Sequence, residues 1–454
     1  MTDGTLILGA GMTGLAAGIA SGHPVIEAEV SPGGICRSYA MRPGDTRLQP
    51  GATDDAEAYR FENGGGHWIF GGDPGVLDFI RRLAPVKHYV RQSSVYFPDS
   101  GNYAPYPIQN HLRYLDRSVA VPALAEMAQP PGRPATTMKE WVEGAFGQTL
   151  SELFFSPFHE LYTAGLYQYI APQDGYKSPV NLELALQGAL EDVPAAGYNT
   201  TFIYPQGGLN LLAGRMAAQC DVEYDRRVVQ FDTDSRKLMF ADGSTRPYDR
   251  VLSTLPLNRV MEMTGLSVTD RPDPHTAVLV VNIGALKGER CPDDHWLYVP
   301  CSKSGFHRVG FYSNVDRSFL PVGARDSGDK VSIYVERAFP PEKKPDAGEI
   351  DACCTQIVDE LQQWGFIETA EVVHPTWVDV AYTWSWPGSA WPRQAMQALE
   401  AVGIYQTGRY GRWLFQGIAD SIRDGFVAGS CFRSVANDQA APVRPAGKAP
   451  VDAL

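Results

Sequence analysis

The chain has 454 residues, of which 44% are hydrophobic and 20% are charged, and its formal net charge at pH 7 is −13. This length exceeds what one simple core supports, so we expect two or three structural domains in an ordinary globular protein. The acidic balance argues against a nucleic-acid partner, which requires a basic face. No long apolar run or signal-peptide pattern is present, and the seven cysteines show no regular spacing. We therefore expect a cytoplasmic protein that does not enter a membrane and has no metal centre.

The first 14 residues combine a mainly apolar run with closely spaced glycines. Residues 5–8 precede Gly9, Gly11 and Gly14 at the G-x-G-x-x-G spacing, and Ala10, Met12 and Thr13 lie between them. This order predicts a strand, a tight turn and a helix whose first N–H groups face a pyrophosphate.

A second apolar stretch supports the same prediction. Residues 24–26 end at Glu27, followed by Ala28. An acid at the end of a second parallel strand is placed to bind a ribose hydroxyl of a dinucleotide. We therefore predict a dinucleotide-binding unit, the alternative being a chance glycine-rich turn.

The remaining predicted elements follow in chain order. Helical spacing is found at 74–83, 137–164, 180–190, 349–364 and 418–429, and the helical region as a whole runs from about 106 to 195. Strand patterns occur at 89–96, 228–231, 237–240, 250–256 and in alternating segments between 275 and 340.

These elements predict an α/β fold with a discontinuous Rossmann-like unit. That unit takes residues 1–85, 200–265 and 400–435, with a helical unit at 86–199 and a mainly antiparallel sheet unit at 266–399. Residues 436–454 are rich in Ala, Pro and Asp and are predicted to be a flexible tail.

Further motifs resemble a known superfamily. They are Gly33-Gly34 with Arg37 and Ser38, the loop Phe61 to Phe70, Tyr106-Pro107-Ile108-Gln109-Asn110, Trp296 to Pro300 with Arg308, and Gly408 to Trp413. Their types and order resemble the flavoproteins of the amine-oxidase and UDP-galactopyranose mutase superfamily, with the mutase branch the more similar.

The resemblance implies FAD as cofactor, active in its reduced form. It places the following residues at the cofactor: Gly9, Ala10, Gly11, Met12, Thr13, Gly14, Glu27, Ala28, Gly33, Gly34, Arg37, Ser38, Gly65, Gly66, His67, Val228, Gly408, Arg409 and Ser421. His67, Tyr298, Arg308 and Arg409 are the expected catalytic residues.

The implied activity is interconversion of pyranose and furanose forms of a nucleotide sugar, with reduced flavin N5 attacking the anomeric carbon and no net redox change. Expected substrate contacts are Tyr106, Gln109, Asn110, Tyr167, Tyr169, Tyr298, Arg308, Asn314, Tyr382 and Phe415. An external reductant such as NAD(P)H is also implied, and a homodimer is compatible with the sequence.

Simpler roles stay open for several of these residues. His67 could cap a turn, Arg308 could be a surface arginine, and Gln109 with Asn110 could cap a helix. Tyr298, Tyr382, Trp384 and Trp386 are each also typical of a core.

Two departures from the mutase pattern bear on the substrate. Alignment with the mobile loop of these mutases places Tyr169 at a diphosphate-binding arginine, so that Lys177 or another arginine would compensate, and Phe415 stands at a tyrosine. We therefore expect a substrate other than plain UDP-galactose, such as a GDP-linked deoxy or modified sugar of antibiotic biosynthesis. We also expect the 165–178 loop to close over the site.

Two other functions remain alternatives. An FAD-dependent oxidase or desaturase of the amine-oxidase type shares the nucleotide-binding motif. A nucleotide-sugar binder without activity would explain Tyr169 and Phe415.

Overall fold

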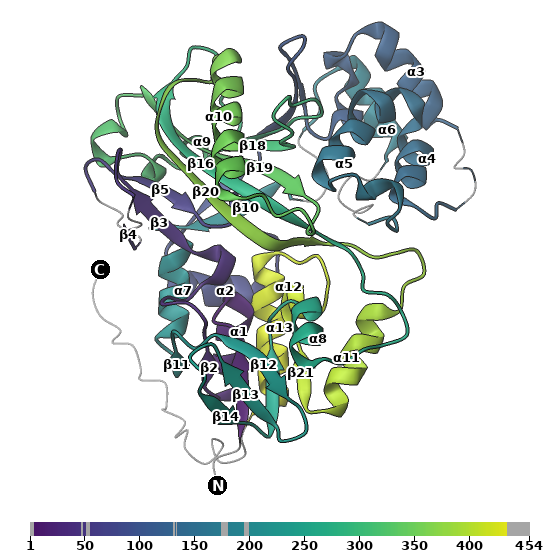
Figure 1. Cartoon of the computed structure of the whole chain (residues 1–454). Coiled ribbons are helices and arrows are strands. Elements are labelled where there is room, and N and C mark those ends of the chain that lie inside the picture. The colour runs from purple at the N-terminus through teal and green to yellow at the C-terminus, as the bar shows by residue number, and fades with distance from the viewer. Residues whose placement is uncertain are drawn as a thin grey trace, which may run out of the picture.

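The computed structural model describes residues 4–433 apart from 47–48, 51–54, 130–131, 133, 174–179 and 195–198. The predicted tail at 436–454 and Lys177 lie outside the described residues. Figure 1 shows three regions: a unit containing the N-terminal strand and helix, a layer of long strands above it, and a group of helices beside those strands.

A parallel sheet forms the centre of the first region. Within the described residues its five strands run in the order β11 (Val222–Glu223), β2 (Val25–Ile26), β1 (Thr5–Leu8), β15 (Arg250–Ser253) and β21 (Ile404–Gln406). Every residue of β1 is buried, because helices and a second sheet cover both of its faces. Ile7 packs into one core and Leu6 and Leu8 into the other, as the two-residue period of a strand requires.

The helices of this region cover the sheet on two sides. On one side α1 (Met12–Ser21) packs against α13 (Ile418–Cys431) and α7 (Leu209–Ala217), and α2 (Pro74–Leu83) contacts α7 and α13. On the other side α8 (Leu257–Thr264) and α11 (Trp391–Ala401) pack with the small sheet β12 (Val228–Asp232), β13 (Lys237–Phe240) and β14 (Thr245–Pro247). The Rossmann-like α/β fold predicted from the glycine motif is confirmed.

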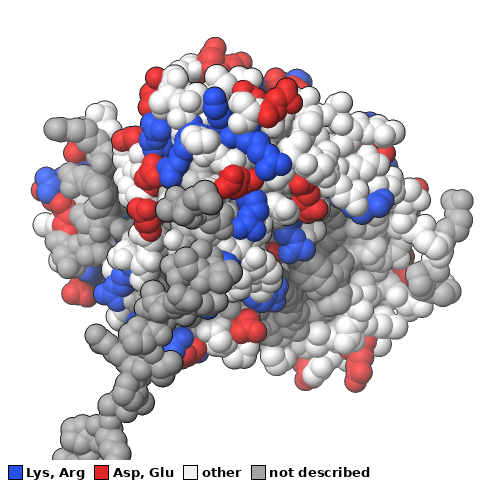
Figure 2. All heavy atoms as spheres, turned by 90° about the horizontal axis from the view of Figure 1, so that it is seen from below, with Lys and Arg blue, Asp and Glu red and all other residues white. Residues whose placement is uncertain are grey.

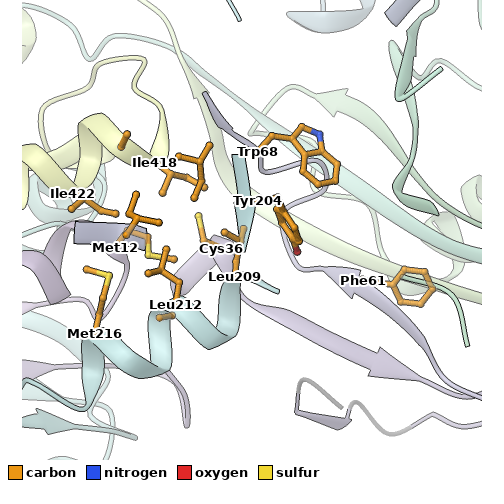
Figure 3. Packing of buried hydrophobic residues seen from close by; sticks show 14 of the residues in the cluster. Met12, Cys36, Phe61, Trp68, Tyr204, Leu209, Leu212, Met216, Ile418 and Ile422 are labelled. Carbon is orange, nitrogen blue, oxygen red and sulfur yellow. The ribbon is translucent and has the colours of Figure 1, made fainter. Parts of the chain in front are cut away.

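Figure 3 shows the core that supports the glycine turn. Met12 of α1, Leu209, Leu212 and Met216 of α7, and Ile418 and Ile422 of α13 lie together there. These helices come from the beginning, middle and end of the chain, so this shared core holds the three chain segments of the discontinuous unit together.

A long mainly antiparallel sheet forms the second layer. Over the described part of the chain its seven strands are β20 (Ile367–Thr383), β16 (His275–Lys287), β19 (Lys330–Phe339), β18 (Arg308–Phe311), β17 (Trp296–Tyr298), β8 (Ser93–Phe97) and β9 (Asn102–Pro105). Helix α10 (Ala347–Gln363) covers one face with Cys353, Cys354, Ile357 and Leu361. The antiparallel sheet predicted between 275 and 340 is present, and its strands β16 and β19 are buried along most of their length.

The boundary of the helical unit corrects the sequence prediction. Residues 93–105, assigned there to the helical unit 86–199, form β8 and β9 of the long sheet, because β8 pairs with β17 in parallel. The single strand predicted over 89–96 is two strands: β7 (Val86–Val90) pairs instead with β10 (Thr201–Pro205). Strand β7 pairs with β10 and strand β8 pairs with β17, so the chain passes from one sheet to another between β7 and β8.

The helical group itself begins beyond the Tyr106-Pro107 peptide, which is cis. Its α-helices are α3 (Arg117–Met127), α4 (Met138–Leu150), α5 (Ser156–Tyr162) and α6 (Leu182–Leu190), and a π-helical turn at Ser151–Phe155 joins α4 to α5. The Thr137–Glu140 capping box starts α4. No helix of the described chain has the length and apolar character needed to cross a bilayer.

The remaining described elements are short. They are the small sheet β4 (Gln49–Pro50), β3 (Ser38–Met41) and β5 (Tyr59–Glu62), strand β6 (Ile69–Phe70) beside β10, and helices α9 (Tyr312–Val315) and α12 (Gly408–Gly411). On the face seen in Figure 2, basic and acidic side chains are interspersed.

Candidate functional site

The glycine turn between β1 and α1 has the geometry of a phosphate cradle. Gly9 has φ +94°, and a Cβ on Gly14 would lie 1.8 Å from the Gly9 carbonyl oxygen, so both positions require glycine. A Cβ on Gly11 would meet nothing within 4 Å, which leaves open space above the turn. No side chain caps the N-terminus of α1, so its first N–H groups face this space without a side-chain acceptor.

The carboxylate of Glu27 stabilises this turn by accepting backbone hydrogen bonds. Its Oε2 accepts a hydrogen bond from Ala10 N at 2.6 Å and its Oε1 accepts one from Glu29 N at 2.9 Å. The carboxylate lies at the end of β2, as predicted, and fixes the turn and the following loop in relation to one another. This position is compatible with a ribose contact.

One large cavity extends from the glycine turn to the long sheet and the helical group. Counting its part open to solvent, it encloses about 2020 Å³. From the nucleotide-binding side Gly11, Met12, Thr13, Gly33, Cys36, Arg409 and Ser421 line it. From the other side come Tyr106, Trp141, Phe154, Phe155, Phe158, His159, Tyr162, Tyr298, His307, Arg308, Glu336, Tyr382 and Phe415. A cofactor and a second ligand can therefore meet in one space.

The loop at 64–67 approaches this cavity closely because of its glycines. A Cβ on Gly66 would lie 2.2 Å from Tyr334 Oη, and one on Gly65 would lie 2.9 Å from Glu336 Oε1. His67 follows them, with Nδ1 3.3 Å from the Gly65 carbonyl oxygen. Burial, reinforced by the charge of Arg409, lowers the pKa of His67 to about 4, so the imidazole is neutral at pH 7.

Arg409 of α12 lines the cavity. Its Nη1 donates to the Gln416 carbonyl at 3.0 Å and its Nη2 to the Ala381 carbonyl at 3.2 Å. Its Nε is buried and has no hydrogen-bond partner among the described residues. The guanidinium also lies 4.5 Å from the ring centre of Phe415.

Three neighbouring strands place Tyr298, Arg308 and Glu336 in one cross-strand row. Tyr298 of β17 is the register partner of Arg308 of β18, which in turn is the partner of Glu336 of β19. Arg308 Nη2 donates to both carboxylate oxygens of Glu336, at 2.6 Å to Oε1, and to Tyr382 Oη at 3.3 Å. Tyr382 Oη in turn donates to Glu336 Oε2 at 3.1 Å.

This row is electrostatically coupled. Burial opposes ionisation of Glu336, but the charge of Arg308 lowers its pKa to about 2. Burial likewise opposes the charge of Arg308, and Glu336 raises the pKa of that guanidinium. The charged residues among the described lining are Arg308, Glu336 and Arg409, so Arg409 is the cation there without a carboxylate partner.

Five expected substrate residues do not line this cavity, and their contact with a substrate stays a prediction. Gln109 and Asn110 are buried in a 3₁₀ turn and neither caps it, and the Asn110 carbonyl packs against Gly188 of α6. Asn314 donates to the carbonyls of Pro292 and Asp294, both at 2.8 Å. Tyr167 is packed in the helical core, whereas Tyr169 is 62% exposed.

The remaining expected cofactor residues lie behind or beside the cradle. Outside the cavity lining are Gly9, Ala10, Gly14, Glu27, Ala28, Gly34, Arg37, Ser38, Gly65, Val228 and Gly408. Several of them support the cradle: Gly408 packs on Thr13, Ser38 Oγ donates to Glu62, and Arg37 Nη1 donates to Ser31 Oγ. Val228 packs in the core beside the small sheet at β12.

Glu336, His307, Phe158, Tyr162 and Cys36 were not predicted for the site. Glu336 sits in an ordinary strand pattern, and its role emerges from its register with Arg308. Trp384 and Trp386 lie outside the lining, and Arg308 lines the cavity, so it is not the simple surface arginine considered above. Burial raises the pKa of the Cys36 thiol to about 12, which keeps it protonated.

These residues fit a bound dinucleotide flavin. The open space above Gly11, the uncapped start of α1 and the partnerless Nε of Arg409 are suited to phosphates. The close approach of the Gly64 to Gly66 loop provides a flat wall for a ring system. The residues that would hold the cofactor are Gly11, Met12, Thr13, Gly33, Ser421, His67 and Arg409.

Comparisons with known proteins agree with this fit. A family model described as flavin containing amine oxidoreductase matches residues 24–278. A crystal structure of reduced UDP-galactopyranose mutase matches with a TM-score of 0.80 and 21% identity, over 94% of this chain and 95% of that chain. At these identities the match shows the fold.

Two other solved structures share this fold. The CLA-producing fatty acid isomerase from P. acnes matches with a TM-score of 0.57 and 14% identity, over 95% and 99% of the two chains. Wild-type putrescine oxidase bound to putrescine matches with a TM-score of 0.52 and 17% identity, over 97% and 99%. Because the family model covers more than half of the sequence, the chain belongs to the flavin containing amine oxidoreductase family.

Proposed function

We propose that this protein is a flavin-dependent nucleotide-sugar mutase that interconverts pyranose and furanose rings without net redox change. The observation that carries the proposal is the continuity of the flavin cradle with the row Tyr298–Arg308–Glu336 in a single cavity. The fold similarity to reduced UDP-galactopyranose mutase supports it. In this proposal FAD binds to the unit formed by 1–85, 200–265 and 400–435, and the helical and sheet units supply the substrate walls.

When bound in its reduced form, the flavin would supply a nucleophilic nitrogen for the anomeric carbon. The protein's own task is then to bind the nucleoside diphosphate that departs and returns. Arg308 provides a guanidinium for that anion, whereas Arg409 is assigned to the cofactor. The ring of Tyr298 packs on that of Tyr106 at 4.4 Å between centres, with the two planes tilted by 42°, which fixes its orientation at the cavity wall.

Aromatic side chains of the helical group exclude water from the sugar. Phe158 lies edge-on to Tyr298 at 5.5 Å, and Tyr162 lies edge-on to Tyr382 at 4.8 Å between ring centres. Because these contacts join the helical group to the sheet, the reacting sugar is enclosed from both sides. His67 is neutral and offers a hydrogen bond without a competing charge.

The substrate is proposed to differ from UDP-galactose. Tyr169 stands where the mutase pattern has an arginine and is outside the cavity lining, and Phe415 lacks a hydroxyl. A GDP-linked deoxy or modified sugar is the substrate class we propose. The reaction requires an external reductant, NAD(P)H or another, to keep the flavin reduced.

The experiment incubates the holoprotein with UDP- and GDP-sugars, with and without dithionite, and follows the ring form by NMR. We expect a furanose–pyranose change in the reduced samples alone. Binding of a nucleotide sugar without ring interconversion in either sample would overturn the mutase proposal in favour of a non-catalytic binder.

A second candidate is an FAD-dependent oxidase or desaturase acting on an amine or hydrocarbon. The observation in its favour is that Glu336 already neutralises Arg308, which leaves a largely aromatic cavity. Bleaching of the flavin by such a substrate, with oxygen consumption, would support this candidate over the mutase.

A further inference from the structure

His307 is a buried histidine at the junction of the sheet and the helical group. It is 1% exposed and lines the cavity immediately before Arg308. Its backbone N–H donates to the Glu336 carbonyl at 3.1 Å, and its carbonyl accepts from Val299 N at 2.9 Å. These two backbone bonds hold the residue firmly at the edge of the cross-strand row.

The imidazole nitrogens of His307, in contrast, lack hydrogen-bond partners in the described part of the chain. Neither Nδ1 nor Nε2 has a hydrogen-bond partner among the described residues. Nε2 lies 3.7 Å from Glu336 Oε2, beyond hydrogen-bond distance, and that oxygen already accepts from Arg308 and Tyr382. A buried polar ring without partners costs free energy, so its retention beside a cavity indicates a ligand that completes its hydrogen bonds.

The neighbours of His307 define the kind of ligand group that fits. Its ring lies 5.2 Å from that of Tyr162, 6.0 Å from Phe158 and 6.4 Å from Tyr382, measured between centres. Burial lowers the pKa of His307 against the opposing effect of Glu336, which disfavours the imidazolium form that would bind a phosphate. A neutral ring with an N–H donor and an N acceptor, flanked by aromatic faces, suits the hydroxyl and C–H groups of a sugar.

His307 lines the cavity beside the guanidinium assigned to the diphosphate and close to Glu336. Glu336 joins it to the cofactor loop, because a Cβ on Gly65 would lie 2.9 Å from Glu336 Oε1. Arg308, the next residue, provides the guanidinium assigned above to the diphosphate. A ligand group at His307 therefore lies next to the diphosphate assigned to Arg308, in the same cavity as the Gly64 to His67 loop.

We propose that His307 is a specificity-determining residue that hydrogen-bonds a hydroxyl of the substrate's sugar ring. This inference rests on the proposed nucleotide-sugar function and adds a named contact to the sugar. It makes the affinity for a sugar nucleotide depend on His307, whereas the affinity for the nucleoside diphosphate alone does not.

The test measures dissociation constants of the oxidised holoprotein by calorimetry, so no turnover is needed. The probes are UDP-galactose with UDP and GDP-mannose with GDP. His307→Phe removes both nitrogens but keeps a planar ring, and His307→Asn keeps a polar side chain. His88→Asn, an exposed histidine of β7 outside the cavity lining, is the matched control.

We expect His307→Phe to weaken binding of at least one sugar nucleotide by about tenfold, with its diphosphate affected less than about threefold. His307→Asn should recover part of the loss, and His88→Asn should match the parent protein. Equal effects on both members of each pair, or no effect on either, would overturn the inference.

Two further measurements keep the outcome decisive. Flavin content and the thermal midpoint of each variant show whether it is folded. In the parent protein, the imidazole NMR signal of His307, assigned by its absence in His307→Asn, should shift with the sugar nucleotide and not with the diphosphate. If the signal does not move, the inference fails while the proposed function stands. If the parent protein binds the diphosphates but neither sugar nucleotide, the inference fails, and if it binds none of the four probes, the proposed function itself fails.

Discussion

Arg308 and Glu336 are cross-strand register partners on β18 and β19, and the guanidinium reaches both carboxylate oxygens of its neighbour. In an antiparallel pair such partners project on the same face, so the strand register alone brings them together. The ion pair therefore belongs to the sheet framework, and it sits in the wall of the cavity. Any anionic ligand of Arg308 must compete with Glu336.

That competition gives a prediction for Glu336→Gln. Removing the carboxylate charge frees Arg308 for an external anion, so the dissociation constants of UDP and GDP should fall about tenfold. The same change leaves a cation without its counterion and should destabilise the ligand-free protein by about 3–5 kcal/mol. Calorimetry and urea unfolding measure the two effects.

The stability that this ion pair provides depends on pH, because the pKa of Glu336 differs between the folded and unfolded protein. The pKa of Glu336 is lowered in the folded protein to about 2 from 4.5, so its stabilisation is full above about pH 4.5 and is lost as pH falls toward 2.

Glu371→Gln, which breaks the partly exposed Lys330–Glu371 pair, is the control for Glu336→Gln and should leave the affinities for UDP and GDP unchanged. Unchanged UDP and GDP affinity in Glu336→Gln would contradict the prediction.

Gly14→Ala should prevent flavin retention. The new Cβ would lie 1.8 Å from the Gly9 carbonyl oxygen, so the turn that forms the cradle cannot keep its shape. The ratio of flavin to protein absorbance after purification measures the loss. Gly144→Ala, an exposed helix position of α4 with nothing within 4 Å, should retain flavin and gain about 0.5–1 kcal/mol of stability. Full flavin content in Gly14→Ala would show that the cofactor binds elsewhere.

Arg409→Gln should weaken cofactor binding by about 30- to 150-fold. The change removes a cation from the cavity and leaves the Gln416 and Ala381 carbonyls without its two hydrogen bonds, a loss of about 2–3 kcal/mol. Equilibrium binding of FAD to the apoprotein tests this. Arg412→Gln, which removes the nearby surface pair with Asp424, serves as the control and should bind FAD normally.

Glu62→Gln should flatten the pH dependence of stability between about pH 4.5 and 7. Burial raises the pKa of Glu62 to about 7 from 4.5, so the folded state holds a proton that the unfolded state releases in this range. The free energy of unfolding therefore decreases as pH rises through it, by about 3 kcal/mol in total. Urea unfolding at pH 5 and pH 8 measures the slope.

The matched control for Glu62→Gln is Glu368→Gln, at an exposed position of β20. It should keep the parent slope. A slope that is the same in Glu62→Gln and in the parent protein would assign the effect to another group.

The helices were well predicted where their signals are local. Helix α2 spans Pro74–Leu83, the predicted 74–83, because Asp73 caps it and Pro74 occupies its first turn. Helix α13 extends two residues beyond the predicted 418–429. By contrast, the strand predicted over 89–96 became two, because the partners of β7 and β8 lie in different sheets and no local signal marks the change.

The substrate side of the site was less predictable for the same reason. Asn314, Gln109 and Asn110 have side chains suited to ligand binding, yet Asn314 is engaged by backbone carbonyls and the other two are buried in a turn. Residue type cannot reveal which partner a polar side chain finds. His307 and Glu336 were missed because nothing in their own segments distinguishes them from other strand residues.

The sequence by itself determined the cofactor cradle. Gly9, Gly11 and Gly14 act through backbone dihedral angles and close approaches within a few residues, so their spacing carries the geometry. The tertiary structure alone decided the opposite wall of the cavity, because Tyr298, Arg308 and Glu336 are aligned by strand register across segments that are far apart in the chain. Pairing across a sheet depends on the burial of whole strands, which no short motif records.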